Sequence, residues 1–150
     1  MILSKENFWK SLGFKDLEAD EYKRRTTAVE LGFFSALGGV FYTVLYSYLG
    51  FPNLTVATIS YVIVFFINLF LLNILKNYSL FKTIQLLSYL AFPLAAQLII
   101  GGFIQGSAVA LASFLAPAGA LLYAERKIAR RYFYGFAALI SAAGVVKFYF

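Results

Sequence analysis

The chain contains no cysteine and no histidine. Without cysteine there is no disulfide, no thiolate metal site and no cysteine nucleophile. Without histidine, the usual general base and the commonest nitrogen ligand for metal ions are missing. A serine-based triad cannot be built, and no glycine-rich phosphate loop follows a strand-like run. We therefore predict that this chain is not an enzyme and holds no metal ion or cofactor.

Charged side chains are also scarce. They make up 13% of the 150 residues, whereas hydrophobic residues make up 61%. A soluble domain could not cover its surface with so little charge, so lipid is the expected solvent for most of the chain. Lysine and arginine gather in residues 1–27, 76–82 and 126–131, a clustering typical of cytoplasmic loops. It does not favour a nucleic-acid partner.

The longest apolar run covers residues 31–75 and is broken only at residues 50–53, where glycine, proline and asparagine indicate a turn. About 20 apolar residues suffice to cross the hydrocarbon core, so this run predicts a transmembrane hairpin. The rest of the sequence repeats the pattern. We predict an all-α, polytopic membrane helix bundle over residues 28–150, with five spans at about 29–48, 54–75, 80–103, 107–123 and 132–150.

The charges of the predicted loops orient these spans. The loops after the first and third spans are uncharged, and those after the second and fourth are basic, which places the N-terminus in the cytoplasm. Five spans put residue 150 outside. Either the protein ends at that surface or the chain continues through a sixth span, as in a truncated six-span domain, and we favour the second interpretation.

Residues 1–27 are charged but carry an apolar stripe. This stripe predicts a short amphipathic helix in the cytoplasmic headgroup layer, with Trp9 as an interfacial anchor. A partly disordered tail is the alternative. The stripe consists of Phe8, Trp9, Leu12, Phe14 and Leu17.

Small residues recur at helical spacing in the first and fourth spans and predict close helix packing. A homodimer contact is the alternative for either span. The principal positions are Gly32, Gly39, Ala108, Ala112, Ala116 and Ala120.

Two prolines lie inside the third and fourth spans. Pro93 and Pro117 each remove a backbone donor and can open wedge-shaped space between helices. Together with Gln97, Gln105 and Tyr61, they are candidates for an outward-opening pocket for an apolar ligand. The competing interpretation of buried amides is interhelical hydrogen bonding, which we favour for Asn73 and Gln85.

Residues 86–124 contain Pro93, Gln97, a glycine-rich turn at 101–107 and an Ala-Pro-x-Gly-Ala element at 116–120, followed by a basic stretch. This pattern resembles the N-terminal membrane domain of bacterial class III adenylate cyclases and of related sensor histidine kinases. The resemblance implies a six-span sensor in the bacterial inner membrane, coupled to a cytoplasmic catalytic dimer. This sequence departs from that pattern, because it carries no sixth span and no cyclase domain.

We therefore predict a membrane sensor that detects a ligand or membrane state and regulates a fused or associated cytoplasmic effector. The resemblance implies that this effector is a class III adenylate cyclase. A small transporter or a structural assembly subunit are the alternatives. A transporter is expected to contain an internal repeat, but no convincing repeat relates the two halves of this sequence.

Overall fold

The computed structural model describes residues 5–15, 17–100 and 109–149, with side chains for 7–15, 17–100 and 112–142. This part of the chain is helical and contains no strand. Its elements are α1 (Lys5–Ser11), α2 (Ala19–Tyr48), α3 (Pro52–Leu75), α4 (Tyr78–Ile100), a 3₁₀ helix η1 (Val109–Phe114), α5 (Leu115–Tyr123) and α6 (Arg126–Tyr149).

Three of these helices, α2, α3 and α4, are long and apolar enough to cross a membrane. They correspond to the first three predicted spans, and the all-helical fold is compatible with a membrane helix bundle. The fourth predicted span falls on η1 and α5, where the apolar α-helical stretch is shorter. The fifth falls on α6. Residues 101–108, including Gln105 and Ala108, lie outside the described residues.

Two helices begin more than one turn before the predicted spans. Helix α2 starts at Ala19, and α6 starts at Arg126 within the predicted basic loop. Neither added stretch contains glycine or proline, so nothing in the backbone ends the helix at the membrane boundary. In α2 an ion pair one turn apart, between Arg25 Nε and Glu21 Oε1 at 2.8 Å, also supports the helical conformation.

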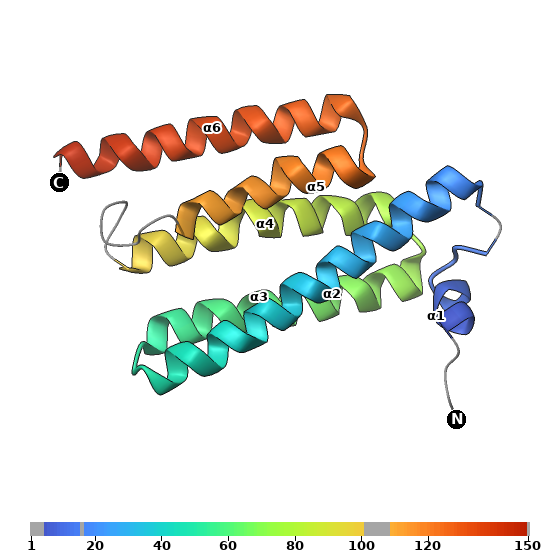
Figure 1. Cartoon of the computed structure of the whole chain (residues 1–150), viewed down its shortest axis with the longest axis horizontal. Helices are drawn as coiled ribbons and strands as arrows, with labels where there is room; N and C mark the ends of the chain where they lie inside the picture. The colour runs from blue at the N-terminus through green and yellow to red at the C-terminus, as the bar shows by residue number, and fades with distance from the viewer. Residues whose placement is uncertain (1–4, 16, 101–108, 150) are drawn as a thin grey trace.

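The long helices run antiparallel, and each packs on its neighbour in the sequence (Figure 1). Helices α2 and α3 form a hairpin joined through Gly50, whose φ of 74° suits glycine. Helix α4 packs on α3, α5 packs on α4 and α2, and α6 lies along α5. The α3–α4 and α5–α6 turns lie at the same end of the bundle as α1.

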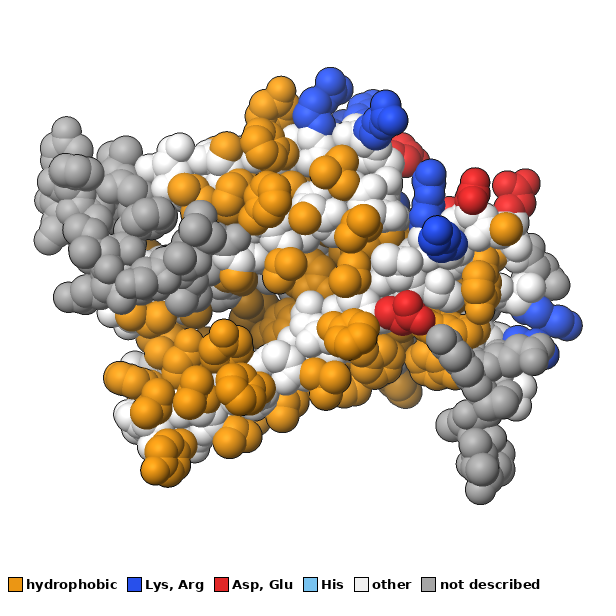
Figure 2. Space-filling model, in the orientation of Figure 1, with side chains coloured by type: hydrophobic (Ala, Val, Ile, Leu, Met, Phe, Trp, Pro, Cys, Tyr) orange, Lys and Arg blue, Asp and Glu red, His pale blue; other side chains and the backbone are white. Residues whose placement is uncertain are grey.

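Charged side chains gather at that end, which we call the charged end (Figure 2). The surface of the long helices is mostly apolar. Phe34, Phe41 and Phe70 are 72%, 64% and 62% exposed, which suits contact with lipid tails and not with water.

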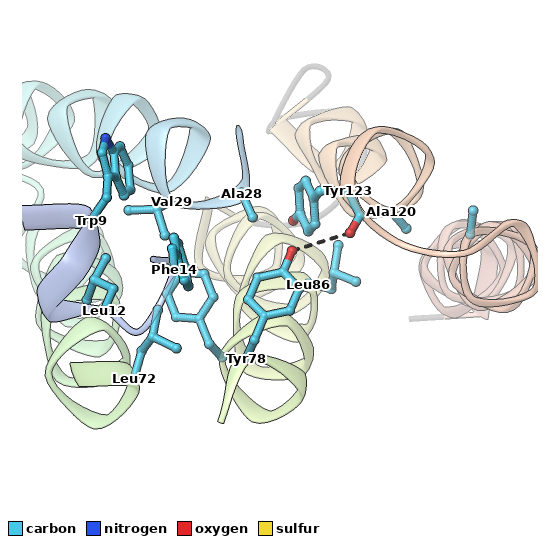
Figure 3. Packing of buried hydrophobic residues seen from close by; sticks show 12 residues of the cluster. Trp9, Leu12, Phe14, Ala28, Val29, Leu72, Tyr78, Leu86, Ala120 and Tyr123 are labelled. Atoms are coloured by element: carbon cyan, nitrogen blue, oxygen red, sulfur yellow. Dashed lines mark hydrogen bonds between the residues drawn. The ribbon is translucent and has the colours of Figure 1, made fainter. Parts of the chain in front are cut away.

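The N-terminal segment closes the charged end of the core (Figure 3). Trp9, Leu12 and Phe14 are buried against α2, α3 and α4, where they meet Val29 and Leu72. The predicted short helix is present over Lys5–Ser11, and the apolar stripe that begins in it packs on protein through Trp9, Leu12 and Phe14. The backbone turns at Gly13, at φ 82°, which brings Phe14 back to the bundle.

Candidate functional site

A cavity of about 510 Å³ separates the α2–α3 hairpin from α4 and the start of α5. We call it the interhelical cavity, and Figure 2 shows the surface hollowed between these elements. It lies in the half of the bundle away from the charged end. Its lining residues are Ser35, Gly38, Gly39, Tyr42, Tyr46, Ala57, Thr58, Tyr61, Ser88, Tyr89, Phe92, Pro93, Ala96, Ala112 and Leu115.

Small residues leave the space for this cavity. At Gly39 an added Cβ would lie 2.8 Å from Cγ2 of Val62, so α2 and α3 approach closely there. Gly38, Ala57 and Ala96 also line the cavity, and their small side chains take up little of its volume. Gly39 thus lets α2 and α3 approach one another, whereas Gly38, Ala57 and Ala96 leave the cavity open.

Pro93 lies inside α4 and lines the cavity. Because proline has no N–H, the carbonyl of Tyr89 one turn earlier receives no helical hydrogen bond from it. The proline ring fills part of the cavity wall, and α4 remains helical from Tyr78 to Ile100.

Hydroxyl groups from three helices meet at the inner wall of the cavity. Ser35 Oγ of α2 lies 3.1 Å from Tyr89 Oη of α4, which joins these two helices by a hydrogen bond. Thr43 Oγ1 and Thr58 Oγ1, 2.9 Å apart, join α2 to α3. These hydrogen bonds satisfy hydroxyl groups whose burial without a partner in an apolar environment would cost free energy.

The hydroxyl of Tyr61 is buried without a hydrogen-bond partner. Ser35, Gln85 and Tyr89 lie near it, but none has the geometry to bond with it. Its ring packs edge-on against Phe92, with the centroids 5.4 Å apart. Tyr61 therefore lines the cavity with its ring, while its buried hydroxyl lies within the protein beside Ser35, Gln85 and Tyr89.

The predicted site residues divide into three groups. Tyr61 and Pro93 line the cavity. Gln97 is 2% exposed in α4, and Pro117 is buried in α5, but neither lines the cavity. Gln105 lies outside the described residues.

The predicted packing positions are placed as follows. Gly32 and Gly39 are buried on the α3 side of α2, and Ala116 and Ala120 are fully buried in α5. Ala112 instead faces the cavity and is exposed. Ala108 lies outside the described residues. The small-residue stripe of the fourth predicted span therefore does not lie on one packed face throughout.

Sequence reasoning missed Ser35 and Tyr89 as site residues. A signal was present for Tyr89, because tyrosine in a membrane helix prefers the interfaces, and this one falls near the middle of a predicted span. The partner of Tyr89 was not predictable, since it depends on how α2 and α4 are rotated toward one another.

In the part of the chain that the structure describes, tyrosine is the only ionisable side chain that lines the interhelical cavity. Among the described residues, no group of three histidine, cysteine, aspartate or glutamate side chains could hold a metal ion.

Comparisons with protein-family models, with curated proteins and with solved structures found no match. The resemblance of residues 86–124 to cyclase membrane domains therefore stays a prediction from the sequence.

Proposed function

We propose that this chain is a membrane sensor domain whose ligand occupies the interhelical cavity. The observation that carries the proposal is a cavity of about 510 Å³ with mostly apolar walls and the hydroxyl groups of Ser35 and Tyr89 beside it. Such a combination is typical of small-molecule sites, in which a few polar groups orient an otherwise apolar ligand. The expected ligand is an apolar molecule with one hydrogen-bonding group.

The packing of the bundle suggests how binding would produce a signal. The cavity lies between the α2–α3 hairpin and α4, and the hydrogen bond between Ser35 and Tyr89 bridges the two parts beside it. A ligand that fits better when the two parts are further apart shifts the population toward that packing. The shift reaches the charged end, where an effector can read it. By the resemblance, this effector is a class III adenylate cyclase or a related catalytic domain.

We also propose five membrane crossings, with the charged end in the cytoplasm of a bacterial inner membrane. The basic residues at the α3–α4 and α5–α6 turns support this orientation. Single cysteines at Asn53 and Asn77 test it in a chain that has no native cysteine. An impermeant maleimide should label Asn53→Cys in intact spheroplasts and Asn77→Cys only after lysis. The opposite labelling pattern would contradict the proposed orientation.

The binding step is tested with a matched pair of variants. Ala57→Phe fills the cavity, whereas Val56→Phe changes the next residue, which is 62% exposed and does not line it. Molecules retained by the purified proteins are extracted and identified by mass spectrometry. We expect an apolar species in the parent and in Val56→Phe that is depleted in Ala57→Phe. Equal retention by all three proteins would contradict binding in this cavity.

The sensing step needs a measurement of helix packing. Spin labels at Ser47→Cys and Leu98→Cys report the separation of α2 and α4 at their exposed ends. Adding the retained species to stripped protein in nanodiscs should shift the measured distance in the Val56→Phe background and not in the Ala57→Phe background. A bound ligand that leaves the distance between the labels unchanged would contradict the sensor. Net flux of that ligand across the membrane of proteoliposomes would instead favour a transporter.

A further inference from the structure

A second cavity, of about 520 Å³, lies at the charged end and is separate from the interhelical cavity. We call it the basic cavity. It is formed by the first part of α2, the α3–α4 turn and the α5–α6 turn. Its lining residues are Glu21, Arg24, Arg25, Leu75, Lys76, Asn77, Tyr78, Ser79, Lys82, Tyr123, Ala124 and Glu125.

Two of its four basic side chains are held by protein partners. Arg25 bonds to Glu21 at 2.8 Å, and its guanidinium carbon lies 4.8 Å from the centre of the Tyr78 ring. Lys76 Nζ donates to Asn73 Oδ1 at 3.2 Å and to the carbonyl of Ser11. These contacts give the cavity a fixed shape.

The other two basic side chains, Arg24 and Lys82, form no ion pair with a carboxylate in the described part of the chain. Lys82 Nζ lies 5.7 Å from the centre of the Tyr78 ring, the ring that the guanidinium of Arg25 also approaches. The lining holds four basic side chains against the two acids Glu21 and Glu125, so the cavity carries an excess of positive charge. This excess favours an anion, which can form charge-assisted hydrogen bonds with Arg24 and Lys82.

The first turn of α4 adds backbone donors to this cavity. Asn77 caps the helix, with its Oδ1 accepting a hydrogen bond from the Leu80 N–H at 3.0 Å. The N–H groups of Tyr78 and Ser79 precede any possible helical acceptor and lie at the positive end of the helix dipole. Tyr78 and Ser79 line the cavity together with Arg24 and Lys82.

The cavity also reaches the apolar surface of the bundle. Leu75, at the end of α3, lines the cavity and is 54% exposed. An apolar helix surface that gives way to basic side chains is where the phosphates of a bilayer meet a membrane protein.

We propose that the basic cavity binds a phosphate group, supplied by an anionic lipid headgroup or by a free phosphate-bearing anion. Arg24 and Lys82 contact the phosphate oxygens, and the first N–H groups of α4 complete the site. This site is independent of the ligand proposed for the interhelical cavity, and either can exist without the other.

The test uses the full chain in nanodiscs and two double variants. Arg24→Gln with Lys82→Gln removes the two unpaired cations of the cavity. Lys127→Gln with Arg130→Gln removes the same charge from exposed positions of α6 that do not line it. Circular dichroism verifies that each protein is helical before binding is measured.

One arm measures phosphatidylglycerol retained from mixed phosphatidylcholine nanodiscs by native mass spectrometry. The other follows thermal unfolding in pure phosphatidylcholine nanodiscs as inorganic phosphate is added. We expect the cavity variant to lose about tenfold in affinity in at least one arm, with the α6 control unchanged. Loss in the lipid arm identifies a headgroup site, and loss in the phosphate arm alone identifies a soluble anion. Equal losses in both variants, or no loss in the cavity variant, would overturn the proposal.

Discussion

The backbone of Gly32 in α2 lies directly against the ring of Phe65 in α3. A Cβ built on Gly32 would be 2.3 Å from Cε2 of Phe65, closer than any real contact, and Phe65 itself is 1% exposed. The two helices therefore meet at a contact that only glycine permits without movement of the phenylalanine ring.

Gly32→Ala should consequently destabilise the α2–α3 pair by about 1–3 kcal/mol, the usual cost of overpacking. Thermal unfolding in detergent measures the effect. Gly38→Ala is the matched control, because an added Cβ there meets no atom within 4 Å. The control should be neutral or slightly stabilising, since alanine favours the helix. Similar losses in both variants would show that α2 and α3 do not pack through Gly32.

Trp9 is the chain's only tryptophan, so its fluorescence reports the docking of the N-terminal segment. It is 6% exposed, and its ring stacks on Phe14 with the centroids 6.0 Å apart. We expect weak quenching by brominated lipid, because protein and not lipid surrounds the indole. Moving the indole to a lipid-facing position, with Trp9→Phe and Phe34→Trp together, should restore strong quenching, since Phe34 is 72% exposed. Strong quenching of Trp9 itself would instead place the segment in the headgroup layer.

Asn68 links α3 to α4 in the interior of the bundle. Its Nδ2 donates to the carbonyl of Phe81 at 3.0 Å, and the residue is 1% exposed. Asn68→Leu should lower stability by about 1 kcal/mol, the size expected for one interhelical hydrogen bond in a membrane protein. Asn73→Leu, on an exposed position of the same helix, should change stability much less. Unfolding midpoints in the same detergent compare the two, and equal shifts would argue against an interhelical role for Asn68.

The hydrogen bond between Ser35 and Tyr89 should limit the movement of α2 relative to α4. Tyr89→Phe removes the hydroxyl with little change in shape, so we expect a broader distance distribution between spin labels at Ser47→Cys and Leu98→Cys. Tyr134→Phe removes a hydroxyl from a side chain that is 65% exposed on α6 and serves as the control. An unchanged distribution in Tyr89→Phe would show that the bond does not hold these helices together.

For Pro93, the position along the helix is enough to predict a place beside the cavity. Pro93 disrupts the helical hydrogen-bond ladder wherever it lies in an apolar run, and an outer-half position follows from its place in the span. Gln97 lies four residues beyond Pro93, and this spacing overshoots a full helical turn by about 40°. The two side chains therefore do not share one direction, and packing decides that Gln97 is buried away from the cavity. Gln105 lies outside the described residues, so its predicted place at the cavity stays a prediction.

Helix ends illustrate a second limit. Hydropathy marks where lipid begins, whereas a helix ends where the backbone can no longer continue. The two coincide at Gly50 and Pro52, which are turn residues as well as membrane boundaries. They do not coincide at Ala19 or Arg126, where charged residues continue the helix beyond the apolar stretch.

The sequence by itself determined that the chain is helical, that lipid surrounds much of it, and that its charges collect at the turns. These properties depend on local composition, because backbone hydrogen bonds must be satisfied within each apolar segment. Only the tertiary structure decided that Tyr61, Tyr89 and Ser35 meet beside a cavity and that Trp9 faces protein. Lipid is as apolar as the helix surfaces it touches, so hydropathy does not specify which face of a helix turns inward. Close packing and hydrogen bonds between particular side chains make that choice.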